Sequence, residues 1–161
     1  MESARTQVHA VLDSKGNIVG FNKSVSQKAV WVAKLMRKTQ NNGVFKKLQI
    51  PMQKREIIRI SQKYGLKIND LNLKIQRDEK LLKLPFCGST DYDNIGRIDL
   101  FPNSFMSEEQ LVRTIIHERC HVLQLRKRGK EYVQKNLDLM EKQAYSFEEF
   151  WYNIVRKRVK T

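Results

Sequence analysis

The segment from Ser107 to Arg128, SEEQLVRTIIHERCHVLQLRKR, decides how this sequence is interpreted. Ser107 followed three residues later by Gln110 forms a capping box, which is typical of a helix N-terminus. Gly129 comes directly after the segment and predicts the end of the helix there. Residues 117–121, HERCH, match the pattern H-E-x-x-H. We therefore expect one long helix that carries two histidines one turn apart.

This spacing allows two imidazoles to bind one metal ion. His117 and His121 would lie on the same face of the helix, with Cβ atoms about 5–6 Å apart. Their ring nitrogens could then reach one Zn²⁺ ion at about 2.0–2.1 Å. Glu118 would lie beside the pair and take a proton from water whose pKa the zinc lowers to about 7. The motif predicts a zinc site with Glu118 as the catalytic base.

A catalytic zinc usually has a third protein ligand, which we expect on the next helix. If that helix folds back antiparallel, residues 138–142 come level with the histidines, at about 1.5 Å of rise per residue. Asp138 and Glu141 are the acids of this stretch. Glu141, beside the predicted core stripe, is the first choice and Asp138 the alternative. Glu148, about 10 Å further along, is interpreted as a surface acid or a residue that supports the site.

The rest of the sequence predicts an α+β fold, with a small antiparallel or mixed sheet packed on the H-E-x-x-H helix and a C-terminal helix. We expect one domain over residues 1–161, with a basic hairpin and helix in 1–50 and the core in 51–161. The expected elements are a hairpin over 8–21, helices over 26–40, from Pro51 to Gly65 and over 131–156, strands over 71–75 and 96–101, and a loop over 85–94. The residues expected in the core include Ile115, Ile116 and Leu123, and the stripe Val133, Leu137, Met140, Ala144, Phe147, Trp151 and Ile154.

Composition limits the partners. The net charge is +14, and residues 21–85 hold sixteen Lys and Arg against four Asp and Glu. Such a field attracts anionic partners such as nucleic acid, although solvated helix faces would have the same composition. No apolar run approaches the roughly 18 residues of a membrane span, and no signal peptide is recognisable. Cys87 and Cys120 are expected to be unpaired.

Three segments carry a resemblance to a known family: RIDLFPNSF at residues 97–105, the H-E-x-x-H helix, and EKQAY at residues 141–145. Together they resemble the zincin-like metallopeptidase toxin domains of bacterial polymorphic and contact-dependent toxin systems. Those domains are similar in having a strand that ends near a proline and a glutamine three residues after the second histidine, here Gln124. A later helix in them carries a Glu-x-x-Ala-Tyr-like segment. The resemblance covers residues 86–152.

This resemblance implies a gluzincin-like fold with Glu141 as the third metal ligand and Glu118 as the general base. It implies that the strand Ile98–Phe101 pairs with an extended protein substrate. It also implies a secreted or delivered effector domain that acts in the cytoplasm of a target cell, together with a cognate immunity protein. Because this chain is strongly basic, we expect that immunity protein to be acidic.

The leading interpretation is therefore a zinc metallopeptidase that hydrolyses a peptide bond in a target-cell protein. Tyr145, one turn after Glu141, is a candidate catalytic donor to the oxyanion, or else a core tyrosine. The alternatives are a basic nuclease toxin and a protease that docks on nucleic acid through its basic N-terminal half. Acidic residues crowd the half with the motif, which disfavours a nuclease. A non-catalytic zinc module would need a fourth ligand, and the sequence offers no convincing one.

Overall fold

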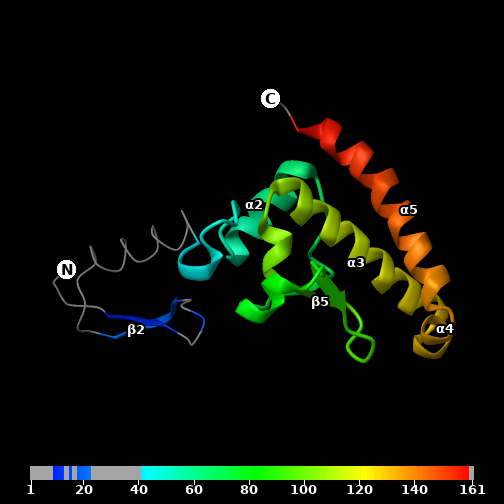
Figure 1. Cartoon of the computed structure of the whole chain (residues 1–161), viewed down its shortest axis with the longest axis horizontal. Helices are drawn as coiled ribbons and strands as arrows, with labels where there is room; N and C mark the ends of the chain where they lie inside the picture. The colour runs from blue at the N-terminus through cyan, green and yellow to red at the C-terminus, as the bar shows by residue number, and fades with distance from the viewer. Residues whose placement is uncertain (1–8, 13–14, 16–17, 23–40, 160–161) are drawn as a thin grey trace.

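The computed structural model describes residues 9–12, 15, 18–22 and 41–159, and in them an α+β fold. β1 and β2 form the expected hairpin. The helix predicted over residues 26–40 lies outside the described residues. Figure 1 shows the elements in space. They are β1 (His9–Leu12), β2 (Ile18–Asn22), α2 (Lys54–Tyr64), β3 (Asn72–Ile75), β4 (Gly88–Thr90), β5 (Arg97–Leu100), α3 (Glu108–Arg128), α4 (Lys130–Lys135) and α5 (Leu137–Val155).

A mixed three-stranded sheet supports α3. β5 lies in its centre, parallel to β3 and antiparallel to β4. Ile98 and Leu100 of β5 are fully buried, and the buried Leu73 and Ile75 of β3 show the predicted alternation. Because β5 is already paired with a strand along each of its two edges, the expectation that it pairs with an extended substrate is wrong.

The sheet also contains a strand that the sequence did not indicate. β4 lies in the segment 85–94, which was expected to be a loop. Its residues Gly88, Ser89 and Thr90 are small and show no apolar alternation, so no local signal marks them as a strand. Pairing with β5 holds them extended, and β4 is the edge strand beside α3.

α2 and the chain before it complete the core. α2 ends at Gly65, which has the left-handed φ of 68° that favours glycine, as predicted. Pro51 lies before the helix and not in its first turn, because α2 begins only at Lys54. Leu48 and Ile50 are buried with the side chains of α2 and α3.

The long helix α3 begins and ends where the sequence predicts. The Ser107 hydroxyl accepts a hydrogen bond from the Gln110 N–H at 3.0 Å. The Gln110 side chain donates to Cys87 Sγ at 3.2 Å. It therefore does not bond back to the Ser107 N–H, as the expected capping box would require. Ile115 and Ile116 are buried. Leu123 is 41% exposed, so its assignment to the core was wrong.

The predicted C-terminal helix is two helices, because α4 and α5 are separated at Asn136. α5 then runs antiparallel beside α3 (Figure 1). Met140 and Ala144 of the predicted stripe are buried, but Leu137 and Trp151 are exposed. A stripe with 4-3-4-3 spacing drifts around a helix of 3.6 residues per turn. The drift turns Trp151 towards solvent and brings the neighbouring Tyr152 and Val155 into the core, where the sequence had not placed them.

The N-cap of α3 provides a test of local stability. Replacing Ser107 with alanine removes the acceptor for the Gln110 N–H. We expect Ser107→Ala to lower the free energy of unfolding by about 1 kcal/mol. The control is Ser146→Ala, because Ser146 is exposed within α5 and alanine has the higher helix propensity. Urea unfolding monitored by circular dichroism should show a loss for Ser107→Ala alone, and equal stability of the two variants would contradict this role.

Candidate metal centre

His117 and His121 from α3 and Glu141 from α5 come together at one point. Their ligand atoms all lie within 4.8 Å of one another. The Nε2 atom of His121 is 2.5 Å from Glu141 Oε1, and that of His117 is 3.4 Å from Glu141 Oε2. Asp138, the alternative ligand, lies apart from this group, among the residues of the α4–α5 junction. Two imidazoles and a carboxylate form a donor set that suits a divalent cation, so this group could hold a metal ion.

Both imidazoles are held by a second partner on the far side of the ring. His117 Nδ1 is 3.1 Å from Glu148 Oε1, and His121 Nδ1 is 2.8 Å from Gln124 Oε1. These acceptors favour the tautomer with hydrogen on Nδ1, in which the Nε2 lone pairs could bind a metal ion shared with Glu141. Glu148 is therefore a supporting residue of the site and not only a surface acid.

The supporting partners also join the two helices. Gln124 Nε2 donates to the Met140 carbonyl at 3.0 Å, one residue before Glu141. Arg113 donates to Glu148 at 3.2 Å, and its guanidinium lies 4.2 Å from the centre of the Tyr152 ring. The contacts that orient the histidines thus fix the level of α5 against α3.

The three residues face a cavity of about 590 Å³. α3 and α5 form part of its wall, and the segment 85–90 with Tyr92 forms the rest. Glu118, Glu141 and Glu148 line this cavity, whereas no lysine or arginine is among the described residues of its lining. In a chain with a net charge of +14, the interior of the candidate site is therefore acidic.

Glu118 lies in the cavity wall with its side chain buried. Its carboxylate Oε1 accepts a hydrogen bond from Thr90 Oγ1 at 2.8 Å. Burial raises the pKa of Glu118, and the negative charge of Glu141 raises it further, while the histidines and the Thr90 hydrogen bond act in the opposite direction. A carboxyl group whose pKa is raised in this way suits the transfer of protons near neutral pH.

Tyr145 lies at the mouth of the same cavity. Its side chain is 62% exposed, so the alternative of a core tyrosine is wrong. Its ring packs edge to face with the ring of His117, with 4.6 Å between the ring centroids. Burial and the charges of Glu141, Glu148 and Glu118 raise the pKa of Tyr145. The phenol therefore stays protonated at neutral pH and can donate a hydrogen bond.

Sequence reasoning missed the wall of the cavity that faces α3. Thr90 hydrogen-bonds to Glu118, and Gly88 lies beside the Glu118 side chain without a Cβ of its own. Phe86 and Tyr92 line the cavity at either end of β4. The only signal of this wall in the sequence was a run of small residues between two aromatic ones. Cys87 and Cys120 are both unpaired, as predicted.

Comparisons of the chain with models of protein families, with curated proteins and with solved structures give no match. The resemblance to zincin-like toxin domains therefore depends on the sequence segments that carry it. None of the described helices is long and apolar enough to cross a membrane.

The metal site can be tested by separating the two candidate acids. We expect the wild-type protein to bind one Zn²⁺ per chain, measured by mass spectrometry of metals and by competition with a fluorescent chelator. Glu141→Gln should weaken binding by at least about 10–100-fold, the range for loss of a group that merely orients a ligand. Asp138→Asn is the matched control and should bind as the wild type does. Equal effects of the two substitutions would remove Glu141 from the site.

The metal-free protein should show a pH dependence that originates at His117. Burial alone would lower the pKa of His117, but the hydrogen bond to Glu148 and the charges of Glu118 and Glu141 raise it above 6.5. The protonated ring therefore stabilises the fold fully below the unfolded pKa of about 6.5, and this stabilisation is lost as the pH rises through the raised pKa.

Urea unfolding with a chelator present should show a free energy of unfolding that falls as the pH increases from about 6 to 8.5. His117→Asn should reduce this slope. Glu118, whose pKa is also raised, contributes in the same direction from about pH 4.5 upwards, and its contribution remains in the variant. An unchanged slope in the variant would contradict the role given to this histidine.

Proposed function

We propose that this chain is a zinc-dependent metallopeptidase that acts as a toxin effector domain. The observation that carries the proposal is the arrangement of Glu118, a buried carboxylate on the wall of the same cavity as the group His117, His121 and Glu141. Catalytic zinc sites use three protein ligands and leave one position open, whereas structural sites are closed by four. Among the described residues the group has three members, which favours a catalytic site over an interaction module.

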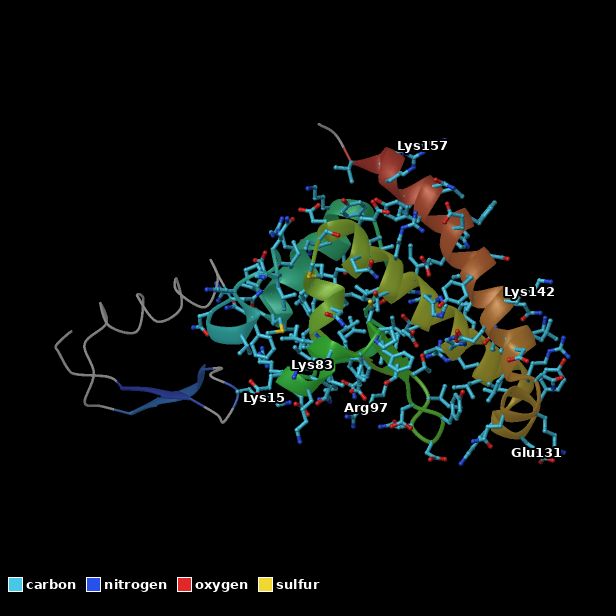
Figure 2. The ribbon with its side chains drawn as sticks, viewed as in Figure 1. Lys15, Lys83, Arg97, Glu131, Lys142 and Lys157 are labelled. Atoms are coloured by element: carbon cyan, nitrogen blue, oxygen red, sulfur yellow. The ribbon has the colours of Figure 1, made fainter. Side chains whose placement is uncertain are left out.

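The charge of the cavity favours a peptide over a nucleic acid as the substrate. Three glutamates and, among the described residues, no lysine or arginine line it, and this arrangement repels phosphodiesters. In Figure 2, the labelled Lys83, Lys142 and Lys157 lie at separate places in the molecule. A nuclease is therefore not supported. A protease that docks on nucleic acid through cations outside the cavity remains compatible with the site.

The edge strand β4 offers a place for an extended peptide. Phe101 N donates to Cys87 O at 2.8 Å, and Asp91 N donates to Arg97 O at 3.1 Å. Residues 87, 89 and 91 therefore turn their backbone groups towards β5, and Gly88 and Thr90 turn theirs towards the free edge. A peptide that added to this edge would pass along the cavity wall beside Glu118.

The reaction would be the addition of water to a peptide carbonyl. A bound zinc ion would supply a Lewis acid for the carbonyl oxygen and lower the pKa of water. Glu118 accepts the proton of the attacking water and delivers it to the amide nitrogen as the C–N bond breaks. The Tyr145 phenol donates a hydrogen bond to the oxyanion that develops on the carbonyl oxygen.

The toxin role rests on the resemblance of residues 86–152 to effector domains and on the charge of the chain. We propose delivery into the cytoplasm of a target cell and neutralisation by a cognate immunity protein. A net charge of +14 favours an acidic partner for this purpose. By covering the cavity mouth beside Tyr145, such a partner would exclude the protein substrate.

Replacement of Glu118 tests the proposed function. We expect Glu118→Gln to retain zinc and folding while kcat for peptide hydrolysis falls by about 10²–10⁴-fold, because the amide cannot accept the proton. Glu131→Gln is the control, since Glu131 is an exposed acid on α4 away from the cavity. Induced expression of each protein in bacterial cells should arrest growth for the wild type and the control only. Full hydrolysis by Glu118→Gln would disprove this mechanism.

A further inference from the structure

Thr90, the last residue of β4, contacts two atoms of Glu118. Its Oγ1 lies 2.8 Å from the carboxylate Oε1 and 3.1 Å from the main-chain oxygen of the same residue. In the described part of the chain, no other side chain hydrogen-bonds to this carboxylate. Glu118 sits in a wide cavity, so without this contact its side chain could rotate towards other directions.

Gly88 allows β4 to come close enough for this contact. A Cβ atom at position 88 would lie 2.9 Å from the Asp99 carbonyl oxygen, 3.0 Å from Thr114 Cγ2 and 3.5 Å from Glu118 Cγ. Side chains alternate along a strand, so positions 88 and 90 face α3 together. The absence of a side chain at position 88 therefore allows β4 to lie close to α3. At this distance the Thr90 hydroxyl reaches the Glu118 carboxylate.

Thr90 also belongs to the edge of the sheet that no other described strand pairs with. The backbone bonds of Cys87 and Asp91 to β5 leave the N–H and C=O of Thr90 directed away from β5. One residue thus presents its backbone to the edge that would receive a peptide and its hydroxyl to the carboxylate that would act on it. Because the backbone and the hydroxyl belong to the same residue, a single Cα–Cβ unit fixes the distance between them.

From these contacts we infer that Thr90 is a positioning residue, which sets the direction of the Glu118 carboxylate relative to a peptide on β4. The inference rests on the proposed function, in which Glu118 is the base. A hydroxyl can donate or accept, so it can hold the carboxyl group before and after proton uptake. Displacement of a catalytic group by about 1 Å can reduce a rate by about 10²-fold. Loss of the hydroxyl should therefore reduce kcat and leave KM nearly unchanged.

The test compares Thr90→Val, which keeps the shape of threonine, with Thr90→Ser, which keeps the hydroxyl. Ser146→Ala is the control, because Ser146 is exposed on α5 and does not line the cavity. Crystal structures of the metal-free proteins should show the Glu118 carboxylate displaced in Thr90→Val and in place in the others. For the zinc-loaded proteins, kcat should fall by about 10–100-fold in Thr90→Val, with KM and zinc affinity unchanged, and Thr90→Ser should restore most of the rate.

Several results would overturn the inference. One is a Glu118 carboxylate that stays in place in Thr90→Val with kcat unchanged, and another is an equal loss of kcat in the valine and serine variants. If Thr90→Val does not fold, Thr90→Ala removes the hydroxyl without adding a methyl group and is judged by the same criteria. If the wild-type protein cleaves no peptide, the proposed function fails, while the crystal structures still decide whether Thr90 directs the carboxylate.

Discussion

The antiparallel packing of α5 on α3 is the constraint on which the candidate site depends. It brings Glu141 from a distant part of the chain to the two histidines. Gln124 fixes the register through the Met140 carbonyl, and Arg113 fixes it through Glu148. Each of these contacts also holds one imidazole or its partner. A shift of α5 by one helical turn, about 5.4 Å, would separate the carboxylate from both rings.

A second feature is the opposition between the charge of the chain and the charge of its cavity. The carboxylates there are offset only in part, by the Arg113 guanidinium that lies behind Glu148. The carboxylates raise the pKa of His117, and burial together with the charge of Glu141 raises the pKa of Glu118. In the part of the chain that the structure describes, no lysine or arginine lines the cavity. A site of this kind attracts positive ions, which agrees with the role of a metal centre and not with that of a phosphate-binding site.

The helical part of the site could be predicted because its signals are local. One turn separates His117 from His121, and a Ser cap and a Gly end fix the limits of α3. The assumption that the next helix folds back left Asp138 and Glu141 as candidates, and the position of Glu141 beside the core stripe favoured it. β4 could not be predicted, because Gly88 and Thr90 become a strand only by pairing with β5. The contact between Thr90 and Glu118 was hidden for the same reason.

The division of the ligands between two helices has a consequence for the dynamics of the protein. A metal ion held by His121 and Glu141 would cross-link α3 to α5 and close the chain between these residues into a ring that includes the break at Asn136. Such a cross-link restricts the unfolded chain more than the folded one. Metal binding would thus control how readily α5 separates from the rest of the domain, and therefore how quickly proteases degrade the protein.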